Sequence, residues 1–291
     1  MGTYSKVRAQ DGTMLRAWTN HGTGLPVVIS NGLGASSAAW PAITAVDSGF
    51  RVVTWHHRGL GGSDRPARPE AIRIEDHAAD LGAVMTAAGM EHALLLGWSL
   101  GVNAAFEFSR LQPQRACGLL AVAGVPGGSL KAMYGPSKMP KELREPAGQV
   151  SARMLPLTGP WLTYIAAAMQ RSQYPAPESN ADAAAQDAVQ PSAIAAMLRE
   201  FAAQDWEWYS RLAVALGEHA AMDVSATSFP VTFLGGRQDS VTSSDDVQAV
   251  ARSIKGARVR ILPAGTHLLP LQYPAFMLDE LRSLARRSGL S

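Results

Sequence analysis

Residues 93–101 read ALLLGWSLG, and residues 102–108 read VNAAFEF. The apolar run at 93–96 is typical of a buried parallel strand, and the segment after residue 101 has the composition of a helix. Ser99 therefore stands at a corner between a strand and a helix, with Gly97 and Gly101 on either side. Glycines there allow a turn tight enough to expose the hydroxyl, and the helix N-terminus supplies free N–H groups and a partial positive charge. The stretch predicts a nucleophilic serine; the alternative is an ordinary strand-to-helix turn of small residues.

The composition is that of an ordinary globular protein with one large core. The chain has 291 residues, of which 47% are hydrophobic and 17% charged, and its net charge is +2. This balance gives no reason to expect a nucleic acid or an anionic membrane as partner. The N-terminus lacks an apolar signal region, and no apolar run is long enough to span a bilayer. The single cysteine, Cys117, cannot form an internal disulfide and is expected to be a buried filler, so a reducing cytoplasm fits best.

Short apolar runs alternate with helical patterns along the first half of the chain and again near its end. Strands are predicted at residues 7–9, 15–19, 27–29, 51–55, 93–96, 118–122, 231–234 and 258–262, and helices at 38–46, 74–88, 102–111 and 275–287. A strand–helix alternation of this kind implies a mostly parallel sheet built from right-handed crossovers. The expected fold class is α/β.

The alternation stops after residues 125–128, which read VPGG, and resumes near Asp223. The sequence between is rich first in proline and then in alanine, notably at 182–188, and shows helical periodicity without a convincing strand. We therefore expect a core domain made of residues 1–126 and 223–291, interrupted by a helical insertion at 127–222. Its large side chains are Trp161, Tyr164, Met169, Trp206, Trp208 and Tyr209.

A serine nucleophile needs a base, and the base needs an acid to orient it. In enzymes with this type of strand–helix corner, the three residues follow one another in the chain as serine, acid and histidine, which makes Asp239 and His267 the candidates. Each follows a predicted strand and falls at the same sheet edge as Ser99. Asp223 is the alternative acid, but it precedes its strand and belongs at the opposite edge. A solvated turn aspartate and a loop histidine remain the plain alternatives for Asp239 and His267.

When a serine attacks an acyl carbonyl, the negatively charged oxygen of the tetrahedral intermediate needs two backbone N–H donors. Leu100 supplies the first, as the residue after the serine, and Leu33 in the glycine-rich loop at 30–34 is the expected second donor. The adjacent histidines His56 and His57 are not expected to bind a metal, because neighbouring strand residues point to opposite faces and no third ligand stands nearby. No cofactor is expected.

Taken together, the sequence resembles the α/β-hydrolase superfamily over nearly its whole length outside the insertion. The resemblance is carried by residues 28–34 (VISNGLG), residues 57–66 (HRGLGGSDRP), the corner at Ser99, and the loops of Asp239 and His267, in the family's order. Asn31 and His56 depart from it, since many members carry histidine and aspartate there. Serine at the corner is typical of ester, lactone or thioester cleavage, whereas members that act on haloalkanes and epoxides have aspartate. The opening at residues 31–34 is most similar to enol-lactonases and small-ester hydrolases, and the insertion matches the family's helical cap.

The resemblance implies that Ser99, His267 and Asp239 cleave an ester or lactone through an acyl-enzyme. A pocket with Trp98, Trp40 and Gly32 in its wall, next to Leu33, Leu100 and the aromatic residues of the insertion, would favour a small to medium hydrophobic substrate. A carbon–carbon bond hydrolase, a thioesterase, an amidase or a cofactor-free perhydrolase would use the same triad. A binding protein with a vestigial triad is the alternative outside enzymes. The oligomeric state is left open.

Overall fold

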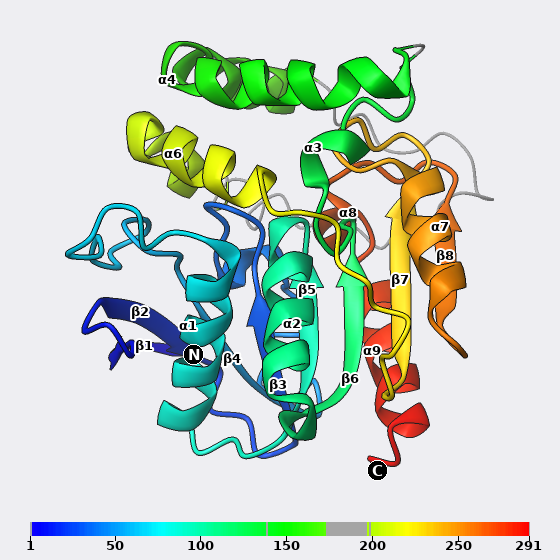
Figure 1. The fold of residues 1–291 in the computed structure, drawn as a ribbon. Coiled ribbons are helices and arrows are strands. Elements are labelled where there is room, and N and C mark those ends of the chain that lie inside the picture. Colours follow the sequence, from blue (N-terminus) through cyan, green and yellow to red (C-terminus); the bar gives the residue numbers. More distant parts are fainter. Residues whose placement is uncertain (1, 138, 173–196, 198, 291) are drawn as a thin grey trace.

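A twisted sheet runs through the computed structural model, which describes residues 2–137, 139–172, 197 and 199–290 (Figure 1). Within these residues the sheet has eight strands in the order β1-β2-β4-β3-β5-β6-β7-β8. The strands β1 and β2 form an antiparallel hairpin, β2 pairs antiparallel with β4, and all further pairs are parallel. Their bounds are β1 (Thr3–Arg8), β2 (Met14–Thr19), β3 (Leu25–Ser30), β4 (Phe50–Trp55), β5 (Ala93–Trp98), β6 (Ala116–Val122), β7 (Val231–Gly236) and β8 (Arg258–Leu262).

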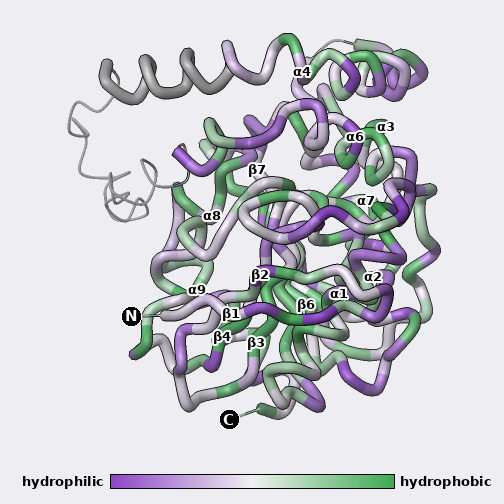
Figure 2. The backbone as a smooth tube through the Cα atoms, turned by 90° about the vertical axis from the view of Figure 1, so that its left-hand side faces the viewer, coloured by the Kyte–Doolittle hydropathy of each residue, from purple (hydrophilic) through white to green (hydrophobic). Residues whose placement is uncertain are grey.

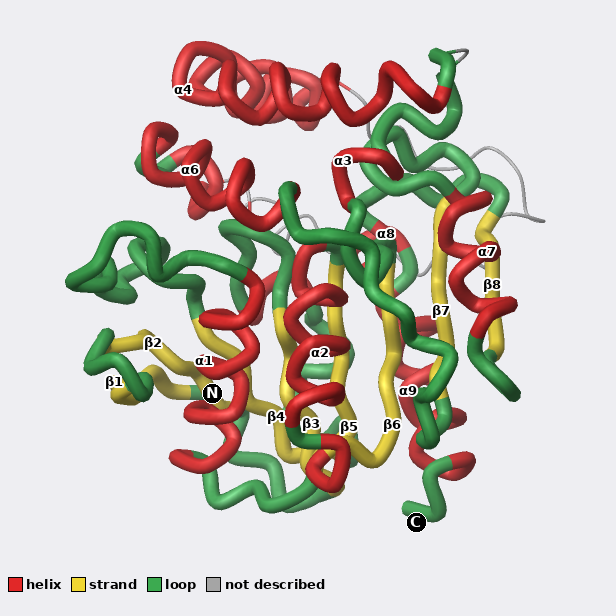
Figure 3. Tube along the Cα trace, in the orientation of Figure 1, coloured by secondary structure: helices red, strands yellow, loops and turns green. Residues whose placement is uncertain are grey.

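The central strands are apolar throughout because both faces of the sheet are covered. The helices α1 (Ile74–Ala87), α2 (Leu100–Leu111) and α7 (Ser244–Ser253) pack on one face, and α9 (Pro274–Arg287) lies on the other (Figure 3). Side chains alternate between the faces: Leu95 joins the first core, whereas Leu94 and Leu96 join the second. Figure 2 shows the resulting apolar centre. The predicted α/β architecture is confirmed, and the strands and the helices α1, α2 and α9 overlap the predicted ranges.

The predicted helix at residues 38–46 is wrong. The chain forms only a short 3-10 turn, η1 (Ser37–Ala39), and continues in turns. Pro41 explains the difference, because a proline disfavours the helical conformation in the residue before it. Trp40 accordingly has φ −126° and ψ 54°. Cys117, expected to be buried, is half-buried on β6.

Between β6 and β7 the chain forms helices that lie over the carboxyl ends of the strands (Figure 1). They are α3 (Ser129–Ala132), α4 (Lys141–Ser172) and α6 (Trp206–Gly217), and we call this segment the helical insertion. The described part of the segment contains no strand. The alanine-rich stretch at 182–188 lies outside the described residues. Across the described chain, no helix has both the length and the apolar character that a membrane crossing requires.

A buried ion pair ties the loop after β4 to helix α1. Arg58 donates from Nε and Nη2 to the two carboxylate oxygens of Asp80, both at 2.7 Å, and from Nη1 to Asp11 at 2.5 Å. Arg58 and Asp80 are both buried. Burial raises the pKa of Asp80 to about 6, although the hydrogen bonds from Arg58 oppose that change.

Replacing Arg58 with methionine should therefore lower the free energy of unfolding by about 3–5 kcal/mol, because it leaves a buried carboxylate without its partner. The loss, measured by urea titration, should be smaller near pH ~5 than near pH ~8, since a carboxyl whose pKa is raised in the folded state takes up a proton on acidification. The double variant Arg58→Met/Asp80→Leu should recover most of the loss. A single variant as stable as the parent would contradict this account.

Candidate active site

Ser99 occupies a strained corner between β5 and α2. Its φ of 55° and ψ of −121° lie in a region that side-chain-bearing residues rarely adopt. The neighbouring glycines are required by contact: a Cβ on Gly97 would lie 2.8 Å from the Cα of Val102, and one on Gly101 would lie 1.8 Å from the carbonyl oxygen of Ser30. The glycine–serine–glycine pattern is thus explained by the packing of helix α2 against β3 and β5.

The structure brings Ser99, His267 and Asp239 into one hydrogen-bonded chain. Nε2 of His267 lies 2.8 Å from Oγ of Ser99, and Nδ1 of the same ring lies 3.0 Å from Oδ2 of Asp239. The loops that follow β5, β7 and β8 deliver the three side chains to one sheet edge. A neutral imidazole whose Nδ1–H donates to the carboxylate presents an unprotonated Nε2 to the serine hydroxyl.

The carboxylate of Asp239 is held by backbone amides. The residue is fully buried, and the N–H groups of Val241 and Thr242 both donate to its Oδ1 at 2.8 Å. Asp223, the alternative acid, is exposed and accepts the backbone N–H of Ser225. The structure therefore joins Asp239, and not Asp223, to His267.

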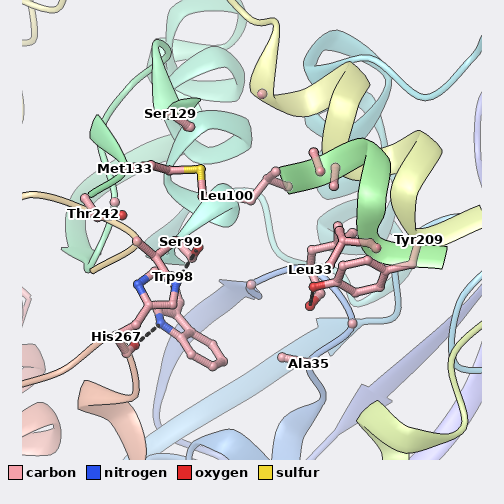
Figure 4. A pocket seen from close by; sticks show the side chains of 18 of the residues that line it. Leu33, Ala35, Trp98, Ser99, Leu100, Ser129, Met133, Tyr209, Thr242 and His267 are labelled. Carbon is pink, nitrogen blue, oxygen red and sulfur yellow. Dashed lines mark hydrogen bonds between the residues drawn. The ribbon is translucent and has the colours of Figure 1, made fainter. Parts of the chain in front are cut away.

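The loop after β3 lies directly against the serine. A Cβ on Gly32 would lie 3.5 Å from Cβ of Ser99 and 3.2 Å from the Trp98 ring. Leu100 is the first residue of α2, so its N–H has no acceptor within the helix. Leu33 and Leu100, the two expected backbone donors, both line the cavity that contains Ser99 (Figure 4).

Asn31 and His57 anchor this loop to the core, a role that the sequence did not suggest for His57. The Asn31 side chain donates to Oγ1 of Thr54 at 2.8 Å and accepts the indole N–H of Trp40 at 2.7 Å. Burial lowers the pKa of His57 to about 4, so the ring is neutral near pH ~7. Its Nε2 lies 3.0 Å from the Asn31 carbonyl oxygen and donates to it, while its Nδ1 lies 3.2 Å from Nδ1 of His77.

The side chains of His56 and His57 have different surroundings. The ring of His56 stacks on Tyr4, with ring centroids 5.8 Å apart, and burial lowers its pKa to about 4. Within residues 2–137, 139–172, 197 and 199–290, no three His, Cys, Asp or Glu side chains are grouped so that they could hold a metal ion.

A cavity of about 500 Å³ opens at Ser99, between the sheet edge and the helical insertion. Its described lining contains no Asp, Glu, Lys or Arg, and His267 is the residue in it that can carry a positive charge. Its large apolar and aromatic members are Leu33, Trp98, Leu100, Leu130, Met133, Leu155, Met197, Phe201, Trp206, Tyr209, Val241 and Leu268. The wall is therefore suited to an uncharged, apolar ligand.

The structure corrects one expected pocket residue. Trp98 and Gly32 line the cavity, but Trp40 does not: it is buried in the core beneath the loop, because its indole donates to Asn31. Among the aromatic residues of the insertion, Trp161 is 69% exposed and Trp208 is buried away from the cavity. The side chains of Tyr164 and Met169 lie outside the described part.

Trp98 connects the serine corner to the histidine loop. Its Nε1–H donates to the backbone carbonyl of His267 at 3.0 Å, and the two rings lie 6.0 Å apart (Figure 4). The indole thus restrains the residue whose ring must reach Ser99.

The variant Trp98→Phe should lower kcat/KM for an ester substrate about fivefold, because one hydrogen bond contributes about 1 kcal/mol. Steady-state kinetics on an aryl ester would measure this. The exposed Trp161 offers the matched control, Trp161→Phe, which should leave kcat/KM unchanged. Equal kinetics for both variants would show that the indole hydrogen bond has no effect on His267.

A parallel sheet covered on both faces, with serine, histidine and aspartate linked at its carboxyl edge, defines the α/β-hydrolase class of proteins. The chain belongs to this family: the model of the alpha/beta hydrolase fold matches residues 26–274. The family resemblance seen in the sequence is confirmed.

Known proteins similar to this chain include hydrolases of several kinds. A protein of Caulobacter segnis named "Putative carbamate hydrolase RutD" is 37% identical over 99 residues, which cover 34% of this chain and 37% of that relative. The chain thus aligns with little more than a third of that relative's length. A thermophilic esterase from Thermogutta terrifontis has a TM-score of 0.72 at 22% identity, covering 98% of this chain and 99% of that one. The enol-lactonase from Burkholderia xenovorans LB400 has a TM-score of 0.73 at 19% identity, covering 97% of this chain and 100% of that one. Both structures share the fold.

Proposed function

We propose that this protein is a serine hydrolase that cleaves a carboxylic ester or lactone of a small to medium hydrophobic substrate through an acyl-enzyme on Ser99. The observation that carries the proposal is the continuous contact from Asp239 through His267 to Ser99, at 3.0 and 2.8 Å. This contact lies at a cavity whose described lining contains no Asp, Glu, Lys or Arg. The esterase and enol-lactonase neighbours support the same reaction class.

In this mechanism Oγ of Ser99 attacks the substrate carbonyl carbon while Nε2 of His267 takes the hydroxyl proton. The N–H groups of Leu33 and Leu100 stabilise the oxyanion of the tetrahedral intermediate, and Asp239 stabilises the imidazolium. The bond to the leaving oxygen then breaks, and His267 gives its proton to that oxygen. Water, deprotonated by His267, then attacks the acyl carbon, the bond from that carbon to Oγ of Ser99 breaks, and His267 returns the proton to Oγ as the acid leaves. No step requires a cofactor.

The cavity supports an apolar acyl or alcohol portion. Charged substrates would lose hydration against a wall whose described residues, apart from His267, offer no ionic partner, whereas alkyl and aryl groups gain from leaving water. We assign residues 1–126 and 223–291 to the catalytic core and 127–222 to a cap that covers this site.

A fluorophosphonate should label the protein with one adduct, located on Ser99 by peptide mass spectrometry. The adduct should be absent in Ser99→Ala. Turnover rates on a matched panel of aryl esters, lactones, thioesters and carbamates, together with an assay of peracid formation, then separate the reaction types. We expect neutral esters or lactones to turn over fastest. An unlabelled native protein would indicate a binding protein and overturn the proposal, and fastest turnover of another substrate would overturn the ester assignment.

A further inference from the structure

The loop beside Ser99 forms a tight turn whose shape depends on one peptide orientation. The N–H of Ala35 donates to the carbonyl of Gly32 at 3.0 Å, and Gly34 has a φ of +76°. These features define a type II turn at residues 32–35, in which the third residue needs a positive φ. Its central peptide joins Leu33 to Gly34. Rotating that peptide would convert the turn to type I and reverse the Leu33 carbonyl and the Gly34 N–H. The N–H of Leu33, the expected oxyanion donor, belongs to the preceding peptide of the same turn.

Two side chains of the helical insertion donate hydrogen bonds to the backbone carbonyls of Leu33 and Gly34 in this turn. The hydroxyl of Tyr209, on α6, donates to the Leu33 carbonyl at 3.1 Å (Figure 4). The side-chain amide of Gln204 donates to the Gly34 carbonyl at 3.3 Å and to the Glu200 carbonyl at 2.9 Å. Asn31, one residue before the turn, is hydrogen-bonded to residues of the core. The hydrogen bonds to Leu33 and Gly34 come from the insertion.

The Tyr209 ring is itself fixed in place. It lies 5.6 Å from the Phe201 ring and 5.3 Å from the Trp206 ring, and a Cβ on Gly34 would be 2.9 Å from its Cε2. Burial raises the pKa of the Tyr209 hydroxyl well above its usual range, so the group remains protonated near neutral pH and can donate. The tyrosine therefore contacts the turn with both its ring and its hydroxyl.

We propose that Tyr209, assisted by Gln204, is a positioning residue that restrains the 32–35 turn and with it the Leu33 N–H expected to face the reacting carbonyl. Donors fixed before the reaction stabilise an oxyanion more than donors that must reorient. The inference rests on the proposed function. It makes the placement of α6 a condition for full activity, because the insertion completes the support of a loop that belongs to the core.

Tyr209→Phe removes the hydroxyl and retains the ring. We expect kcat for an aryl ester to fall about tenfold and KM to change less than about twofold. A tenfold loss lies between the effect of removing one ordinary hydrogen bond and that of removing an oxyanion donor. The affinity for a trifluoromethyl ketone, which forms a tetrahedral adduct on serine, should weaken by the same factor. The pH profile of kcat should keep its shape, since the tyrosine transfers no proton. Gln204→Leu should act in the same direction and less strongly.

Trp208→Phe is the control, because Trp208 neighbours Tyr209 on α6 and donates to the core at the Arg58 carbonyl, 2.8 Å away and outside the turn. It should lower thermal stability and leave the ketone affinity within about twofold of the parent value. An equal loss of ketone affinity in Trp208→Phe would assign the effect to the docking of α6 in general and overturn the role proposed for Tyr209. Unchanged kinetics in Tyr209→Phe, in a parent that the fluorophosphonate labels, would overturn this inference and leave the proposed function standing. A parent that is not labelled would instead overturn the proposed function.

Discussion

The variant Ser99→Ala should lose about 10⁶-fold in kcat toward an aryl ester, because removing the nucleophile removes the acyl-enzyme route as a whole. The remaining donors at Leu33 and Leu100 should still leave the rate about 10³–10⁴-fold above that of water, as binding and oxyanion stabilisation do not need the hydroxyl. Pre-steady-state measurements should show a burst of alcohol release in the parent protein and none in the variant.

Ser109→Ala is the matched control for this experiment. Ser109 is buried on the same helix, α2, and its hydroxyl donates to the Phe106 carbonyl at 2.8 Å, far along the helix from the corner. It should keep the parent kcat. Retention of more than about a hundredth of kcat in Ser99→Ala would show that another group starts the reaction.

The sequence could predict the sheet and the edge at which the site forms, because those features depend on local patterns. Apolar runs bounded by glycine identify β5 and β7, and the glycines around Ser99 reflect contacts that allow no Cβ. Asp239 and His267 each follow a strand, so the direction of a parallel sheet suffices to bring them to the serine. The order of elements along the chain is sufficient for this prediction.

The supports of the loop after β3 could not be predicted, since they join residues far apart in the chain through backbone carbonyls. His57 reaches the Asn31 carbonyl across 26 positions, and Tyr209 reaches that of Leu33 across 176. A carbonyl exists at every residue, so its use leaves no trace in the local sequence. The prediction that Trp40 lines the cavity is wrong for a related reason. Pro41 prevents the expected helix, and the resulting turn directs the indole to Asn31 rather than to the cavity.

Asp239→Asn should lower kcat about 10⁴-fold while leaving the fold intact, because it changes the tautomer of His267 rather than its position. The N–H groups of Val241 and Thr242 require an oxygen at the Oδ1 position, so the new amide nitrogen takes the place of Oδ2, 3.0 Å from Nδ1. An amide that donates to Nδ1 forces the ring proton onto Nε2, which then cannot accept the proton of Ser99. Fluorophosphonate labelling should slow with kcat, while thermal stability should stay close to that of the parent protein. The exposed Asp223 supplies the matched control: Asp223→Asn should leave both rates unchanged, and a larger loss there than in Asp239→Asn would move the acid to the other end of β7.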